Sequence, residues 1–151
     1  MPATREAIYQ AVFELGAAAS WGDPVQQFAV ASRRLKLWGD TPAQPAFYQA
    51  EHGESLTQTS NLPYKRIFKV NWVVYQNTGL NPDVSPTVEN NNILDALENV
   101  LAPKPLDRGY PQRNTLGGLV YHCFIDGPIL KVPGDIDDQA MMVIPITMLV
   151  P

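Results

Sequence analysis

Hydrophobic and polar residues alternate most regularly in residues 64–75. One face of this segment is apolar and the other is polar, and this two-residue period is typical of a half-buried β-strand. The apolar positions are Phe68, Val70, Trp72 and Val74, and the polar positions are Lys65, Lys69 and Asn71. We therefore predict a strand over residues 64–75.

The N-terminal segment has the spacing of an amphipathic helix. Thr4 is placed to cap it and Glu6 lies in its first turn, whereas Gly16 and residues 21–24 break it. Its apolar positions are Ile8, Val12, Leu15 and Ala19.

A second helix is predicted to begin after Ser85 and Pro86. Serine caps free amides and proline presets the first helical φ angle, so this pair is typical of a helix start. Residues 102–105 contain two prolines and end the helix. The predicted buried stripe is Val88, Ile93, Leu94, Leu97, Val100 and Leu101.

The remaining segments of the first half are shorter or more polar. Residues 28–35 are typical of a strand, with a helix over 25–37 as the main alternative, and residues 45–50 begin a second short strand. Residues 51–63 are polar and rich in turn residues, which predicts a loop or an exposed hairpin.

After a connector over 106–114, the last third predicts a terminal sheet. Its strands are residues 115–125, 129–132 and 139–151, separated by turns at 126–128 and 133–135. The order is helix, strands, helix, strands, and strands contiguous in sequence favour antiparallel pairing. We therefore predict an α+β fold: an antiparallel-rich β-sheet with two main helices packed on one face, a two-layer sandwich.

Length and composition fit one soluble globular domain over residues 1–151. The chain is 45% hydrophobic with a net charge of −4, which argues against nucleic-acid binding driven by bulk positive charge. No basic region precedes an apolar run and no apolar segment is long enough to span a bilayer, so we expect neither export nor a membrane partner. The single cysteine, Cys123, excludes an internal disulfide and is expected to be a small buried hydrophobe.

Candidate chemistry is sparse. His52 lies among carboxylates and His122 lies beside Cys123, but strand neighbours point to opposite faces, so the latter two should not meet. The acidic run 135–138 lacks the spacing of a calcium loop, and Gly117-Gly118 leads into a predicted strand rather than a helix, unlike a phosphate-binding loop. We expect no catalytic residue, metal or cofactor.

Several short segments carry a family resemblance. They are Ser32-Arg33-Arg34, Trp38-Gly39-Asp40, Gln44-Pro45-Ala46-Phe47, residues 92–98 with 101–103, residues 115–123, and Ile144-Pro145-Ile146 before residues 149–151. In this order and spacing they resemble the tail terminator, or minor tail, proteins of long-tailed bacteriophages and gene transfer agents. Matching positions such as Arg34, Trp38, Pro45, Asp95, Gly117 and Gly118 carry over as structural positions.

The resemblance implies a non-enzymatic virion protein, assembled in the host cytoplasm and located at the head-proximal end of the tail. Such subunits form a ring, generally a hexamer, on the last ring of the major tail tube protein, stop polymerisation and present the surface that docks the head. DNA would pass through the ring without specific binding, and a net negative charge reduces sticking to it. Within the same class, the alternative is a head-completion or neck connector between portal and tail.

Opposite charges on one subunit suit a head-to-tail contact between copies. We therefore predict that Arg33, Arg34 and the acidic residues Asp135, Asp137 and Asp138 contact a neighbouring subunit or the tail tube. A hypothesis from a different class is a small-molecule-binding or hydrolytic domain that uses His52 and the carboxylates near it.

Overall fold

The computed structural model describes residues 3–77, 85, 87–103 and 113–151. The elements in chain order are α1 (Arg5–Ala17), β1 (Ser20–Trp21), β2 (Gln26–Gln27), β3 (Val30–Ser32), the 3₁₀ turn η1 (Trp38–Asp40), β4 (Ala46–Thr57), β5 (Lys65–Asn77), α2 (Thr87–Val100), β6 (His122–Ile125), β7 (Leu130–Val132) and β8 (Gln139–Val150).

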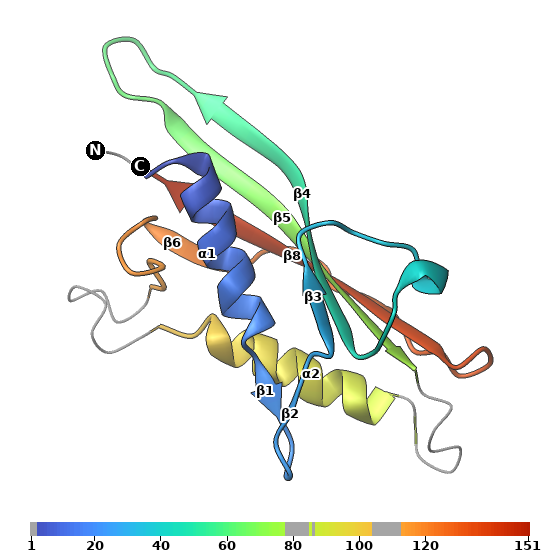
Figure 1. The fold of residues 1–151 in the computed structure, drawn as a ribbon. Helices are drawn as coiled ribbons and strands as arrows, with labels where there is room; N and C mark the ends of the chain where they lie inside the picture. The colour runs from blue at the N-terminus through green and yellow to red at the C-terminus, as the bar shows by residue number, and fades with distance from the viewer. Residues whose placement is uncertain (1–2, 78–84, 86, 104–112) are drawn as a thin grey trace.

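Six strands of the described part of the chain form one sheet in the order β3-β4-β5-β8-β6, and β7 also pairs with β8 (Figure 1). Only β3 and β4 run parallel, whereas the other pairs are antiparallel. The long central pairings join β4 to β5 and β5 to β8. The predicted α+β class with an antiparallel-rich sheet is confirmed.

The main core lies between one face of the sheet and the two helices, which both lie on that face in Figure 1. Thr4 caps α1 as predicted, because its hydroxyl accepts a hydrogen bond from the backbone N–H of Ala7 at 3.1 Å. Alternate residues of β5 and β8 point into this core together with the buried side of each helix. The fully buried members include Ile8, Val12, Phe47, Phe68, Trp72, Val74, Ile93, Leu97, Met142, Ile144 and Met148.

A smaller cluster covers part of the opposite face of the sheet. Tyr48 and Tyr75 are buried there, and Trp38 of η1 packs on the ring of Tyr75 with the centroids 5.4 Å apart. The hydroxyl of Tyr75 donates a hydrogen bond to the backbone oxygen of Lys36 at 2.8 Å. The segment between β3 and β4, which contains η1, therefore covers this part of the sheet.

Several predicted boundaries in the first half change. The strand predicted over 28–35 is confirmed only at β3, and the helix over 25–37 is wrong. The loop over 51–63 is also wrong, whereas its alternative, an exposed hairpin, is confirmed because β4 continues to Thr57 and pairs with the start of β5. The second half of β4 is able to form a strand from polar residues because the apolar residues of this strand pair belong to β5.

The second half also departs from the prediction. Residues 115–121 form turns rather than a strand, and only β6 remains of the predicted segment 115–125. Leu116, Gly117 and Gly118 have φ angles of 53°, 72° and 97°, which reverse the chain. The structure confirms, with small shifts, the second helix and the strands predicted at 129–132 and 139–151. Val88 of this helix is 47% exposed, although the prediction has it buried. The connector over 106–114 lies largely outside the described residues.

Candidate assembly interface

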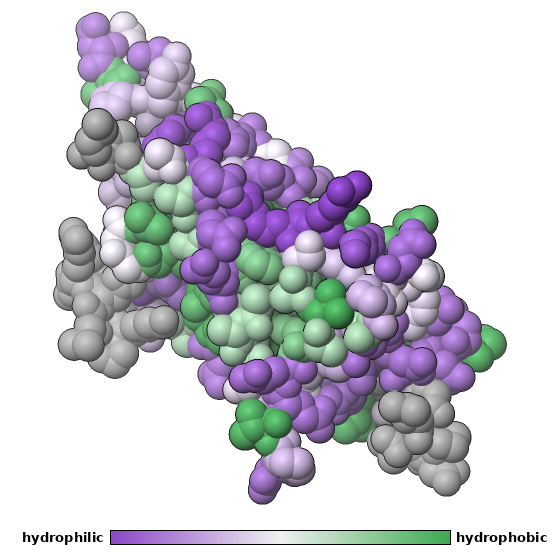
Figure 2. Space-filling model, in the orientation of Figure 1, coloured by the Kyte–Doolittle hydropathy of each residue, from purple (hydrophilic) through white to green (hydrophobic). Residues whose placement is uncertain are grey.

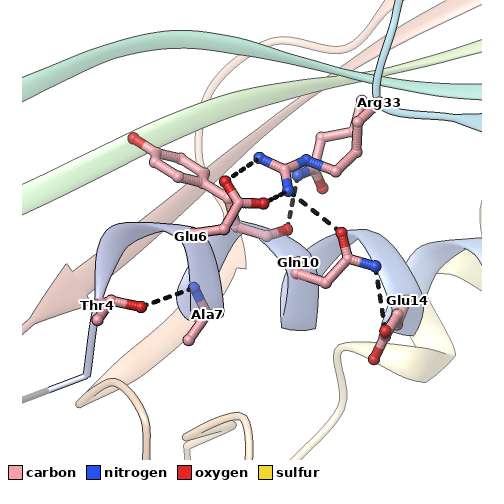
Figure 3. A network of polar contacts seen from close by, with 8 residues as sticks. Thr4, Glu6, Ala7, Gln10, Glu14 and Arg33 are labelled. Carbon is pink, nitrogen blue, oxygen red and sulfur yellow. Dashed lines mark hydrogen bonds and ion pairs between the residues drawn. The ribbon is translucent and has the colours of Figure 1, made fainter.

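Arg33 lies against α1 rather than in solvent (Figure 3). Its guanidinium forms an ion pair with the carboxylate of Glu6 and donates a hydrogen bond to Oε1 of Gln10 at 3.2 Å. Glu6 is largely exposed, so the pair contributes about 1 kcal/mol or less to stability. Arg33 therefore fastens the segment before η1 to the first helix of the same chain.

Arg34 differs from its neighbour. Its side chain is exposed and makes no ion pair with any residue that the structure describes, and only its backbone N–H is engaged, by the hydroxyl of Ser32 at 3.0 Å. Of the two predicted contact arginines, Arg34 is thus the one whose charge is available to another molecule.

The acidic residues form a defined turn between β7 and β8. Asp135, Asp137 and Asp138 are exposed, and Ile136 between them is 98% exposed. A carboxylate oxygen of Asp137 accepts the backbone N–H of Gln139 at 3.1 Å, and the N–H of Asp138 donates to the oxygen of Gly134 at 3.1 Å. No hydrogen bond or ion pair joins this turn to Arg33 or Arg34 in the described ranges, so the predicted basic and acidic side chains are not brought together within the chain.

Gly134 makes this turn possible. Its φ is 75°, and a Cβ atom there would lie 2.7 Å from the backbone nitrogen of Ala140, so any other residue would collide with backbone. Asp138 also has a positive φ, 60°. The turn therefore has a defined backbone that exposes its acidic side chains and Ile136.

At the other end of the sheet, a groove with a volume of about 580 Å³ lies beside the ends of β5 and β8. Leu62, Tyr64 and Tyr121 line it and are each more than half exposed. Ile67 and Leu149, directly opposite each other on β5 and β8, also line it. Because their neighbours Phe68 and Met148 are buried in the helix-covered core, these two point to the other face of the sheet.

A third exposed feature is the outer edge of β4. Only residues 46–48 pair with β3, so no described strand pairs with the outer edge of residues 49–57. The β4–β5 hairpin extends past the helices in Figure 1, and its surface in Figure 2 is largely hydrophilic. A register shift between Glu51 and Gly53 bends the edge.

The carboxylate of Glu54 ties the hairpin to α1. It accepts hydrogen bonds from Arg5 at 2.8 Å and from the hydroxyl of Tyr9 at 2.7 Å. Burial alone would raise the pKa of Glu54, but these two donors outweigh it and leave the pKa below its usual value. Burial and the hydrogen bond to Glu54 raise the pKa of Tyr9. Glu54 therefore has a structural role beside the exposed His52.

The other two candidate reactive residues, Cys123 and His122, point away from each other. Cys123 is buried as predicted, and burial raises the pKa of its thiol to about 12, so it stays protonated at neutral pH. His122 points to the opposite face, and its Nδ1 accepts the backbone N–H of Asn114 at 3.2 Å. Burial and the charge of Arg113 lower the pKa of His122.

Within the described ranges, no three His, Cys, Asp or Glu residues are grouped closely enough to hold a metal ion. No helix in those same ranges has the length and apolar character needed to cross a membrane. Comparison with known proteins gives no matching family model and no matching curated protein. The sequence analysis missed the groove and the free β4 edge; the signals for the groove were Leu62, at the end of a polar segment, and Tyr64, at the start of the next predicted strand.

Proposed function

We propose that this chain is the subunit of a ring that caps the tail tube of a long-tailed bacteriophage or gene transfer agent, ends tail polymerisation and provides the head-docking surface. The proposal starts from the family resemblance. Several of the segments that carry it lie in the sheet or in the second helix: Ala46 and Phe47 at the start of β4, residues 92–98 within α2, and residues 144–146 within β8.

The observation that carries the proposal is the outer edge of β4. The exposed strand edge over residues 51–57 presents backbone N–H and C=O groups that a neighbouring chain is able to pair with. The bulge between Glu51 and Gly53 and the charges beside it limit pairing to a partner of matching register. Such an edge suits a protein whose working state is an assembly.

The test is electron microscopy of particles made after deletion of the gene, with tail length and head attachment scored together. Overlong tails that are not joined to DNA-filled heads are expected. Tails of normal length beside filled heads would instead indicate a neck connector, and normal infectious particles would contradict both functions.

Complementation with His52→Ala separates the assembly function from a hydrolytic one. His52 is exposed on the β4–β5 hairpin, and its side chain makes no hydrogen bond to any residue that the structure describes, so its removal should leave folding unchanged. We expect the variant to restore tail length and head joining as fully as wild type. Particles that assemble normally yet fail in infection would support a chemical role for His52.

A further inference from the structure

We infer that the turn at residues 135–138 of one copy docks into the apolar groove of the next copy. This inference rests on the proposed function, since it names the contact that joins subunits of the ring. The turn offers an apolar tip, Ile136, surrounded by carboxylates, and the groove offers an apolar pocket beside cationic side chains.

The charges of the two surfaces are complementary. The groove is lined by Lys65 and Arg66 and by no acidic residue of the described chain. Arg66 already donates two hydrogen bonds, at 3.0 and 2.6 Å, to the backbone oxygen of Pro151. Lys65 is exposed with no ion-pair partner in the described ranges. Lys65 is therefore the cation available to meet Asp135.

The apolar parts also match. Ile136 is 98% exposed, so nearly its whole side chain is free to be buried, and Leu130 and Val132 on the neighbouring β7 are exposed as well. In the groove, Leu62 and Tyr64 are 57% and 54% exposed. Burial of an isoleucine in an apolar pocket is favourable, and a rim of paired charges fixes its orientation.

One copy is unable to make this contact with itself. The turn precedes the first residue of β8 and the groove lies at its last residues, so the two are roughly 36 Å apart along a twelve-residue strand. Figure 1 shows the β7–β8 turn and the end of the chain at opposite ends of the sheet. When each pair of copies makes this contact once, head to tail, it is heterologous and generates a closed ring or an open filament.

The test is sedimentation analysis of the full chain over a range of protein concentrations. Ile136→Ser should weaken self-association by tenfold or more, on the order expected for loss of a buried isoleucine. Val25→Ser is the matched control, because Val25 is 71% exposed and lies on the distant β1–β2 connection. It should associate like wild type.

A charge exchange tests the pairing itself. Lys65→Glu and Asp135→Lys should each weaken association, and the double variant should recover most of it, with all differences reduced at high salt. Asp135 is chosen for this exchange because the other two aspartates support the turn. The side chain of Asp137 accepts a hydrogen bond within it, and Asp138 has a positive φ.

Three outcomes distinguish a failure of this contact from a failure of the proposed function. Wild-type oligomers that the variants leave unchanged would overturn the contact while leaving a ring possible through another surface. Monomers at every concentration would also overturn it, and the tail-length experiment would then decide the function independently. Open filaments that the variants dissolve would support the contact and count against a closed ring.

Discussion

Gln49 is a buried side chain whose removal should destabilise the fold measurably. It is only 1% exposed and lies between α1 and the sheet. Its Nε2 donates to the backbone oxygen of Tyr9 at 2.9 Å, and its Oε1 accepts the indole N–H of Trp72 at 3.0 Å. One amide thus connects the first helix to two strands.

The change Gln49→Leu keeps the approximate volume and removes both hydrogen bonds. The Tyr9 oxygen also receives the helical bond from residue 13, so it stays partly satisfied. The Trp72 N–H is left buried and unpaired, which costs about 1–3 kcal/mol. New apolar contacts by leucine offset a part of this. We expect a loss of about 2 kcal/mol in the free energy of unfolding.

Urea denaturation measures this loss as a lower midpoint with an unchanged slope. The exposed Gln27→Leu serves as control and should shift stability by no more than about 0.5 kcal/mol. Trp72→Phe removes the donor, so its combination with Gln49→Leu should cost less than the sum of the single changes. Strict additivity, or a Gln49→Leu loss as small as that of the control, would refute the reasoning.

Three other changes test separate parts of the structure. Gly16→Ala should lower the urea midpoint even though alanine favours helices by about 1 kcal/mol, because its Cβ would lie 2.5 Å from the ring of Phe47; a higher midpoint would show that the ring moves away at little cost. Arg33→Ala should lower stability slightly and Arg34→Ala should not, whereas Arg34→Ala should weaken assembly if its free charge contacts a neighbour; equal effects of the two changes on stability would contradict the Glu6 pairing. Glu54→Gln should lower the free energy of unfolding at neutral pH. Because the folded pKa of Glu54 lies below its unfolded value, the stability that its carboxylate contributes is present above the unfolded pKa and is lost as the pH falls through the folded pKa. A difference in stability from wild type that persists in acid would contradict this linkage.

Hydrophobic periodicity predicted the elements whose own residues form the core. The strand at β5 and the helix capped by Thr4 followed from their patterns because one side of each is buried continuously. β4 was cut short in the prediction because its second half, from Glu51, is exposed and has no apolar face to detect. Its extended conformation depends on backbone pairing with β5, and that is a tertiary property.

Local backbone conformation explains the opposite error, a strand that is predicted too long. Residues 115–125 are apolar enough to predict a long strand, but left-handed residues at Leu116, Gly117 and Gly118 turn the chain before β6. The two glycines are visible in the sequence, where they lie within the predicted strand over residues 115–125. Nothing in the sequence showed whether they bend a strand or end it.

The internal pairing of Arg33 changes which cation is expected to meet the acidic turn. The sequence pairs the turn with Arg33 and Arg34, yet Glu6 of the same chain already forms an ion pair with Arg33. A contact through Arg33 would first have to break this pair, whereas Lys65 beside the groove has no such competitor among the described residues. The groove lies beside β5 and β8, and the free edge of β4 lies on the other side of β5. A contact between turn and groove therefore leaves the β4 edge unoccupied.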